Sequence, residues 1–266
     1  MEKVCPLTGY SAGIDVGSIT TKAALVKDGK LVGTHVISTG YNTRKAAARV
    51  FEELLERGAV KSSDVKNIVA TGYGRNNVVF AHKTVTEITC HAAGAYYQDA
   101  SIRSVIDIGG QDSKAIAMNS EGHVLEFIMN DKCAAGTGRF LEVMARALET
   151  DLDSFGDLSA NTTKSVSISS LCTVFAESEV ISLIAGGESR ANIIGGIHES
   201  IGARVGSMAQ RIGLTEPVMM TGGVSLNIGV VRALTNRLGL LIRTSGIAQV
   251  NGALGAALLA SRMKGT

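Results

Sequence analysis

Hydrophobic residues recur along the chain at two spacings, one typical of strands and one typical of helices. Short apolar runs predict strands, and apolar residues that repeat every three to four positions predict helices. Strands are predicted near residues 11–16, 20–27, 30–38, 67–71, 103–108, 113–119, 123–129 and 240–243, and at the start of 216–234. Helices are predicted near residues 43–58, 86–98, 138–149, 174–186, 191–212, 224–237 and 250–263. This alternation predicts an α/β fold.

Two segments of the chain, residues 13–39 and 105–130, have the same pattern. Each starts with a short apolar run that ends in Asp-x-Gly, and each continues with a hairpin signal, Asp28-Gly29 or Glu121-Gly122. The matching positions keep one spacing throughout; they are Asp15 and Asp107, Gly17 and Gly109, and Lys22 and Lys114. A strand, a tight glycine turn and a returning strand are therefore predicted in both halves of the chain.

Backbone N–H groups exposed by such a turn form a concave site for an anion, and glycine is required where a phosphate approaches the backbone closely. One Asp-x-Gly turn would be an ordinary hairpin, but two copies in register predict a grip on a polyphosphate from both sides. Gly222 and Gly223 form a third glycine turn, between a short strand and a helix, that would let a nucleotide lie against it. The small residues of 251–260 fit either close helix packing or a functional helix start.

The repeat predicts two similar α/β domains, each with a central sheet, and a nucleotide cleft between them. We expect the first domain to span residues 1–104 and the second to span residues 105–266. The length of 266 residues allows one large domain or two of about 130 residues each.

Composition narrows the class of protein. Hydrophobic residues make up 45% of the chain and charged residues 19%, as in an ordinary globular protein. A net charge of +2 argues against a nucleic-acid-binding surface. Residues 244–261 carry no charge but include several polar residues and glycines, so no membrane span is expected. The first ten residues lack the apolar region of a signal peptide, and a soluble cytoplasmic protein is expected.

Four cysteines, at positions 5, 90, 133 and 172, are widely spaced. A zinc site usually takes four ligands in close pairs, and a cytosolic chain rarely keeps disulfides. Each cysteine taken alone is interpreted as a small buried hydrophobic residue. Cys90 adjoins His91 in a predicted helix. Because neighbouring helical residues do not face each other, we expect packing at Cys90 rather than a nucleophile.

Several motifs resemble those of known families. The phosphate and adenosine motifs of the superfamily of actin, the Hsp70 chaperones and sugar kinases are similar to DVGSITTK at 15–22, DIGGQD at 107–112 and MTGGV at 220–224. The activators of 2-hydroxyacyl-CoA dehydratases are similar, more specifically, to ATGYGRN at 70–76, TCHAAGA at 89–95, NDKCAAGTGRFLEVMA at 130–145, CTVFAESEVISL at 172–183 and NGALGAAL at 251–258. The resemblance covers almost the whole chain.

The resemblance implies two similar ribonuclease H-like domains that bind ATP or ADP with Mg²⁺. Members of the family are homodimeric ATPases in which one 4Fe–4S cluster bridges the two subunits, and ATP drives single low-potential electrons into a partner enzyme. The implied electron acceptor is an iron–sulfur dehydratase, or a reductase of the benzoyl-CoA or double-cubane-cluster type. Ferredoxin or flavodoxin is the implied donor, and no nucleic-acid or membrane partner is expected.

The phosphate motifs carry the candidate nucleotide-binding residues, joined by one residue of a cysteine motif: Asp15, Gly17, Ser18, Ile19, Thr20, Thr21, Lys22, Gly109, Gly110, Gly136, Gly222 and Gly223. Asp15 would lie near the water shell of the metal, and Asp107 or Gln111 would orient the attacking water as the catalytic residue. Lys22 would reach a phosphate, or would be an exposed strand lysine. Short turns rich in Asp are also common without any catalytic role.

The two cysteines within family motifs, Cys133 and Cys172, are the candidate cluster ligands. A 4Fe–4S cluster normally takes four thiolates, and a two-fold axis would supply four from two chains. Both cysteines precede predicted helices, whose N-termini carry partial positive charge that favours an anion. Gly136 and Gly138 would leave backbone N–H groups free for the sulfur atoms.

Two other functions fit the same fold. A small-molecule kinase would need a pocket for its acceptor, for which 266 residues leave little room, and it would have no use for the two cysteines. The other alternative is a nucleotide-dependent switch without redox chemistry. Iron content separates both of them from the redox hypothesis.

Overall fold

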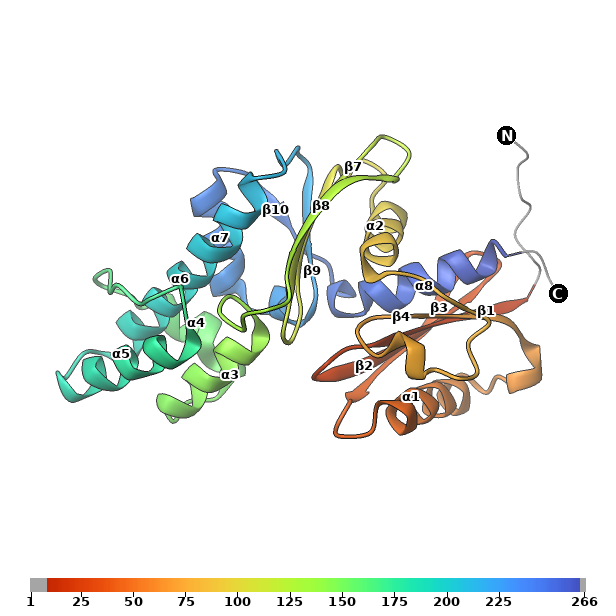
Figure 1. The fold of residues 1–266 in the computed structure, drawn as a ribbon, viewed down its shortest axis with the longest axis horizontal. Helices are drawn as coiled ribbons and strands as arrows, with labels where there is room; N and C mark the ends of the chain where they lie inside the picture. The colour runs from red at the N-terminus through yellow and green to blue at the C-terminus, as the bar shows by residue number, and fades with distance from the viewer. Residues whose placement is uncertain (1–8, 264–266) are drawn as a thin grey trace. The chain divides into compact units, whose positions relative to one another are not determined.

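The computed structural model describes residues 9–263, which form two compact units (Figure 1). Unit 1 comprises the residues up to Ile102, residues 118–124 and the residues from Gln249 onward. Unit 2 comprises residues 103–117 and 125–248. Each unit is built on a five-stranded sheet accompanied by helices, so the predicted α/β class is confirmed.

The sheet of unit 1 has the strand order β3-β2-β1-β4-β5. Its strands are β1 (Tyr10–Val16), β2 (Thr20–Lys27), β3 (Lys30–Ser38), β4 (Val65–Thr71) and β5 (Lys83–Thr84). The helices of this unit are α1 (Thr43–Gly58), α2 (Glu87–Gln98) and α8 (Asn251–Ser261). β1 pairs antiparallel with β2 and parallel with β4. This central strand is buried because α1 packs in the same core as Ile14 and α8 lies against Gly13.

The sheet of unit 2 has the order β10-β9-β6-β7-β8, in which β6 pairs antiparallel with β7 and parallel with β9. Its strands are β6 (Ser104–Ile108), β7 (Ser113–Met118), β8 (Val124–Asn130), β9 (Val218–Thr221) and β10 (Ile242–Arg243). Its helices are α3 (Gly138–Ala147), α4 (Phe155–Ser159), α5 (Thr173–Ala185), α6 (Arg190–Gln210) and α7 (Ile228–Leu238). The two sheets share one connectivity, so the sequence repeat corresponds to a structural repeat.

The helix α1 illustrates how the local sequence determines an element. The side chain of Asn42 accepts a hydrogen bond from the backbone N–H of Lys45 at 3.0 Å, which caps the first turn. The helix ends where Ala59 adopts a left-handed conformation with φ of 49°. Its apolar residues recur at helical spacing, and those buried are Ala46, Ala47, Val50, Phe51, Leu54 and Leu55.

The predicted strands and the longer predicted helices are confirmed, with shifts of a few residues at their ends. The helix predicted at 224–237 begins later, at Ile228, because residues Gly223–Leu226 form a 3₁₀ turn. Asn227 then caps α7 by accepting hydrogen bonds from the backbone N–H groups of Gly229 and Val230. The short elements β5 and α4 were not predicted, since two to five residues carry no usable hydrophobic period.

The helix α8 belongs to unit 1, which differs from the expected division into residues 1–104 and 105–266. The reason is the row of small residues along α8. A Cβ on Gly255 would overlap the carbonyl oxygen of Cys90 in α2, and a Cβ on Gly13 in β1 would overlap the backbone of α8 at Ala253. The backbones of three elements thus approach one another closely. Close packing therefore explains the small residues of this helix.

Burial also accounts for the lack of charge in α8, which forms the C-terminal part of residues 244–261, since nearly every residue of this helix is buried in unit 1. Among residues 9–263, the helices are too short or too polar to cross a membrane.

We expect Gly255→Ala to destabilise the protein by at least about 3 kcal/mol, because the added methyl group would collide with rigid backbone of α2. Gly58→Ala is the matched control, since Gly58 is also helical and its Cβ would meet only Val60 Cγ2 at an ordinary 3.5 Å. That control should be neutral or gain up to about 1 kcal/mol. Urea unfolding measures both, and equal midpoints for the two variants would contradict the close approach of α8 and α2.

Candidate functional site

The first glycine turn joins β1 to β2. The backbone N–H of Gly17 donates to the carbonyl of Thr20 at 3.1 Å and closes the turn. Asp15 and Lys22 lie opposite each other in the strand register, with Lys22 Nζ 3.6 Å from Asp15 Oδ2. The side chain of Lys22 is 13% exposed, so the alternative interpretation as an exposed strand lysine is wrong.

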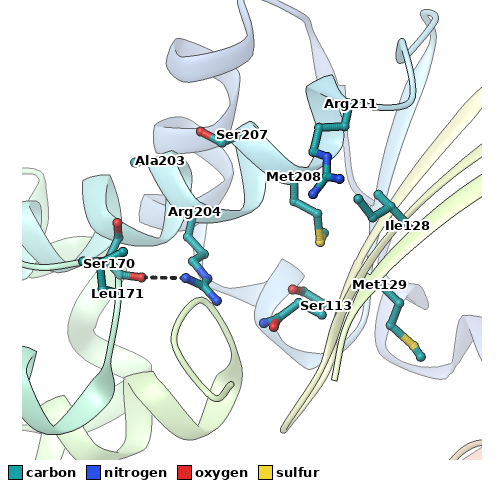
Figure 2. Close-up of a pocket in the computed structure, with 11 residues that line it drawn as sticks. Ser113, Ile128, Met129, Ser170, Leu171, Ala203, Arg204, Ser207, Met208 and Arg211 are labelled. Carbon is teal, nitrogen blue, oxygen red and sulfur yellow. Dashed lines mark hydrogen bonds between the residues drawn. The ribbon is translucent and has the colours of Figure 1, made fainter. Parts of the chain in front are cut away.

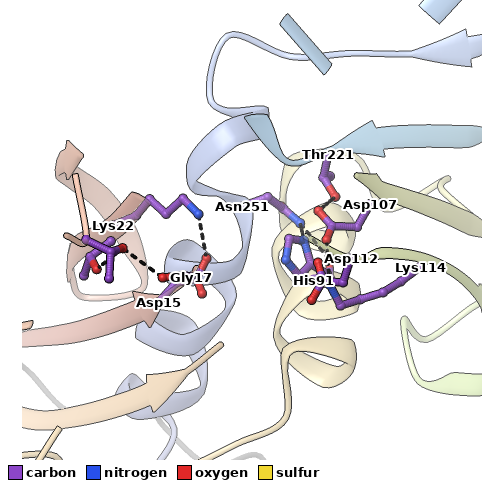
Figure 3. A network of polar contacts seen from close by, with 11 residues as sticks. Asp15, Gly17, Lys22, His91, Asp107, Asp112, Lys114, Thr221 and Asn251 are labelled. Atoms are coloured by element: carbon purple, nitrogen blue, oxygen red, sulfur yellow. Dashed lines mark hydrogen bonds and ion pairs between the residues drawn. The ribbon is translucent and has the colours of Figure 1, made fainter. Parts of the chain in front are cut away.

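The second turn, between β6 and β7, repeats this arrangement. The N–H of Gly109 donates to the carbonyl of Asp112 at 2.9 Å. Asp107 faces Lys114 in the register, and Lys114 Nζ lies 3.2 Å from Asp107 Oδ2 and 2.8 Å from Asp112 Oδ1 (Figure 3). Lys114 is more deeply buried than its counterpart, with a side chain only 3% exposed. The spacing of the Asp, Gly and Lys pairs in the sequence therefore reflects one repeated structure.

Asp107 and Gln111, the two candidates for orienting water, have different surroundings. Asp107 is buried, and its second carboxylate oxygen, Oδ1, accepts a hydrogen bond from Thr221 Oγ1 at 2.9 Å. Gln111 is exposed at the tip of the second turn. Asp107 therefore holds the turn together through Lys114 and Thr221, whereas Gln111 has the accessible side chain.

The residues of the first turn are held by Thr39, at the end of β3. Thr39 Oγ1 donates to the carbonyl of Gly17 at 2.8 Å and lies 2.9 Å from Thr21 Oγ1, and the Thr39 N–H donates to the carbonyl of Ile19. Ser18, Ile19 and Thr20 remain half-buried at the tip of the turn, whereas Thr21 is fully buried. The residues at the tip of the turn thus lie at the surface of unit 1, whereas hydrogen bonds to Thr39 fix the base of the turn.

A second pair of glycine turns follows β4 and β9, and only the turn at Gly222 was predicted from the sequence. Thr71 lies opposite Asp15 in the parallel register, as Thr221 lies opposite Asp107. The glycines that follow, Gly72 and Gly222, have similar positive φ values of 84° and 86°. A Cβ on either would overlap a backbone or carboxylate oxygen of the neighbouring Asp turn. A Thr-Gly pair at the end of a buried strand marks both turns in the sequence, but the prediction included only the turn of Gly222 and Gly223.

The two candidate cluster cysteines come from loops that lie side by side in unit 2. Cys133 follows β8, and its thiol lies 3.5 Å from the carbonyl oxygen of Leu171, the residue before Cys172. Asn130 Nδ2 donates to the carbonyl of Cys133 at 2.8 Å and fixes that loop to the end of β8. Cys172 is the N-cap residue of α5, and both cysteines are partly exposed.

The polar groups next to Cys172 indicate which kind of ligand the two cysteine loops could bind. The hydroxyl of Thr173, at the start of α5, is buried without a hydrogen-bond partner among the described residues. No side chain caps the N-terminus of α5, whose N–H groups carry partial positive charge. Within residues 9–263, no three His, Cys, Asp or Glu side chains converge on a metal site. Two thiols beside an uncapped helix start fit half of the ligand set of an anionic iron–sulfur cluster.

The N-terminus of α3 is used differently from the sequence prediction. The N–H of Gly138 donates to the carbonyl of Gly109 at 2.9 Å, and the N–H of Arg139 donates to the carbonyl of Gly110 at 2.8 Å. The expectation that Gly138 leaves its N–H free for a sulfur atom is therefore wrong. The carbonyls of the second glycine turn cap α3, whose N-cap residue Thr137 makes no side-chain cap. One loop thus carries Cys133 at one end and meets this glycine turn at the other.

Packing and hydrogen bonds account for the other residues singled out in the sequence, which are Gly136 in unit 2 and Cys90 and His91 in unit 1. Gly136 has φ of 81°, and a Cβ there would lie 3.0 Å from Arg204 Cγ on α6. Cys90 is fully buried, and burial raises the pKa of its thiol to about 12, which confirms packing rather than nucleophilic chemistry. His91 accepts a hydrogen bond from Asn251 Nδ2 at its backbone carbonyl. Cys5 lies outside the described residues.

Comparison with known proteins gives a consistent set of relatives. A family model described as the BadF/BadG/BcrA/BcrD ATPase family matches residues 12–260. An activator of lactoyl-CoA dehydratase from Anaerotignum propionicum is 50% identical over 252 residues, which cover 94% of this chain and 97% of that protein.

Two solved structures are also similar to the chain. Component A of the (R)-2-hydroxyglutaryl-CoA dehydratase of Acidaminococcus fermentans is 48% identical, with a TM-score of 0.92 over 96% of this chain and 98% of that one. The activator of the 2-hydroxyisocaproyl-CoA dehydratase from Clostridium difficile, solved with bound ADPNP, is 45% identical, with a TM-score of 0.91 over 95% of this chain and 94% of that one. These likenesses extend over both units.

Proposed function

The chain belongs to the BadF/BadG/BcrA/BcrD ATPase family, and on that premise we propose that it is an ATP-hydrolysing iron–sulfur protein that drives single low-potential electrons into a partner enzyme. The partner would be an iron–sulfur dehydratase of 2-hydroxyacyl-CoA substrates or a related reductase, because close relatives are named as activators of such dehydratases. Ferredoxin or flavodoxin would supply the electron.

One observation carries the proposal, namely the approach of the Cys133 thiol to the carbonyl oxygen of Leu171, directly before Cys172. An ATPase has no need for two partly exposed thiols in adjoining loops. Four thiolates normally hold a 4Fe–4S cluster. Cys133 and Cys172 of one chain would provide two of them, and a second copy related by a two-fold axis would provide the other two. The bound cluster would supply one-electron chemistry at low potential.

The glycine turns would bind the phosphates of ATP. Each turn combines partly exposed residues at its tip with an Asp–Lys pair at its base. Backbone N–H groups in such turns bind anions, and Mg²⁺ held through water or carboxylate oxygen neutralises the phosphate charge. Asp15 would take part in binding the hydrated Mg²⁺, and Lys22 would reach a phosphate. Gln111, exposed at the tip of the second turn, would orient the attacking water.

The hydrogen bonds from Gly138 and Arg139 to the second turn would couple the nucleotide to the cysteines. If the turn changes conformation when ATP becomes ADP, the N-terminus of α3 must follow it or lose two hydrogen bonds. The loop that carries Cys133 would then move with α3. A ligand shifts such an equilibrium only through its different affinities for the two states, so ATP and ADP should favour different arrangements of the cysteine loops.

Iron content tests the shared cluster. Purified without oxygen, the protein should contain about two iron atoms per chain, or one cluster per dimer, since each chain supplies two suitable thiols. Cys133→Ala and Cys172→Ala should each lose this iron, while Cys90→Ala should keep it because Cys90 is buried in unit 1. Iron and sulfide assays give the answer. About four iron atoms per chain would contradict sharing, and a colourless protein would favour a kinase or a simple switch.

Substitutions in the second turn separate the roles of Gln111 and Asp107. Gln111→Ala should lower the kcat of ATP hydrolysis by about 10²-fold, as for loss of one transition-state contact, while ADP affinity and the urea midpoint stay unchanged. Asp107→Asn should lower the stability by about 1–3 kcal/mol, because it weakens buried hydrogen bonds with Lys114 and Thr221. Steady-state kinetics with urea unfolding measure both effects. Wild-type turnover in Gln111→Ala would remove Gln111 from the mechanism.

Gly138→Ala tests the coupling. A Cβ at this position would lie 3.2 Å from the carbonyl oxygen of Gly109, so the turn and α3 must separate by a few tenths of an ångström. In the wild type, chelation of iron by bathophenanthroline should differ by about fivefold or more between ATP and ADP. Gly138→Ala should reduce this difference to less than about twofold, while hydrolysis continues.

Gly246→Ala is the control for that experiment, because no atom lies within 4 Å of a Cβ at Gly246. It should keep the full nucleotide dependence of chelation. A Gly138→Ala variant with wild-type dependence would show that the signal passes elsewhere.

A further inference from the structure

Unit 2 contains a cavity of about 470 Å³ that none of the proposed steps uses. It is lined by the start of β7, the end of β8, the loop before α5 and the C-terminal half of α6 (Figure 2). Its volume lies in the range of small-molecule sites.

Two arginines, one on α6 and one directly after it, give the cavity a positive charge. Arg204 and Arg211 both line it and lie about two helical turns apart. Arg204 Nη1 donates to the carbonyl of Ser170 at 3.4 Å, and neither arginine has an ion pair with another described residue. No carboxylate is among the residues that line the cavity. Two unneutralised guanidinium groups at one cavity favour an anion with oxygen atoms, which guanidinium binds by paired hydrogen bonds.

A buried hydroxyl group points to the same kind of ligand. Ser113 is 1% exposed and lines the cavity, and its Oγ has no hydrogen-bond partner among the described residues. Leaving a buried hydroxyl group unpaired is costly. Its oxygen points toward α6, into the space that Arg204 and Arg211 flank (Figure 2). An oxygen atom of a ligand placed there would accept the missing hydrogen bond.

The rest of the cavity is apolar and adaptable. Ile128 and Met129 border it from β8, where the Met129 side chain points away from α6 (Figure 2), and Met208 lines it from α6. Methionine side chains fill irregular spaces and adapt to varied apolar groups. An inorganic ion would leave these side chains without contact, whereas an anion with a short hydrocarbon portion would cover them.

We propose that this cavity binds a small organic oxyanion, a carboxylate or phosphate ester with a short apolar body. Arg204, Arg211 and Ser113 bind the oxyanion, and Ile128 and Met208 contact the apolar body. The ligand would lie beside both cysteine loops, because Arg204 is hydrogen-bonded to Ser170 and Asn130, which also lines the cavity, holds Cys133. Its binding does not depend on iron and is therefore independent of the proposed redox function.

Methyl NMR of the full chain tests the proposal, with methionine labelled at the ¹³C methyl group. The chain has 8 methionines; Met208→Leu identifies the signal from the cavity, and Met129→Leu identifies the signal of a methionine whose side chain points away from it. Saturating ADP and Mg²⁺ keep the phosphate turns occupied. The probes are hexanoate, hexyl phosphate, inorganic phosphate and the neutral analogue hexanamide. We expect a saturable shift of the Met208 signal with hexanoate or hexyl phosphate, and whichever binds more tightly identifies the head group.

Variants give the decisive comparison. Arg211→Gln and Ser113→Ala should each weaken binding by about tenfold, the loss of one hydrogen bond to a charged group. Arg190→Gln, on the same helix but outside the cavity, should bind like the wild type. The proposal is overturned if neither organic anion shifts the Met208 signal, if hexanamide binds as well as hexanoate, or if Arg211→Gln keeps wild-type affinity. Binding of inorganic phosphate alone would overturn the apolar part.

Discussion

The buried pairing of an aspartate with a lysine across the first two strands of each unit is the interaction on which the rest of the structure depends. Lys114 is 3% exposed, and a lysine so deeply buried is tolerated only because Asp107 and Asp112 surround its ammonium group. The pair fixes the antiparallel register, since a slip of one residue would move either charge to the opposite face. With the register fixed, the glycine turn must present its tip at the same edge of each sheet, where the parallel strand also ends.

The two copies of this arrangement have diverged in what they are attached to. In unit 1 the turn is hydrogen-bonded to Thr39, which directly follows β3. The Asp–Lys distance in this unit is the longer of the two, at 3.6 Å. In unit 2 the turn is hydrogen-bonded to Thr221 through Asp107 and to the first N–H groups of α3. Only the second attachment leads toward the cysteines. Under the proposed function, the repeated turn would serve binding in unit 1, and both binding and coupling to the cysteine loops in unit 2.

The extent of prediction from sequence follows from the range of the interactions. The Asp, Gly and Lys spacing and the helix that starts at Cys172 are local, and both were predictable. The place of α8 in unit 1 depends on backbone contacts of Gly255 and Gly13 with elements distant in the chain. The place of Thr71 opposite Asp15 and the cap on α3 likewise depend on which segments the fold brings together. Ser113 shows the limit most clearly, because an unpaired hydroxyl is visible only when every neighbour is known.

The starts of the two helices that follow the cysteine loops therefore differ. The first N–H groups of α3 are already bonded to the carbonyls of the second glycine turn, so they add little to the stability of an anion beside Cys133. The start of α5 has no side-chain cap and has Cys172 itself at the N-cap position, so its partial positive charge remains available there. Under the proposed function, electrostatic support for a thiolate would come mainly from α5, whereas α3 would follow the turn that we propose binds the nucleotide. The contact of the Cys133 thiol with the carbonyl of Leu171 joins the loops that precede the two helices, so a displacement of α3 would be transmitted to both cysteine loops.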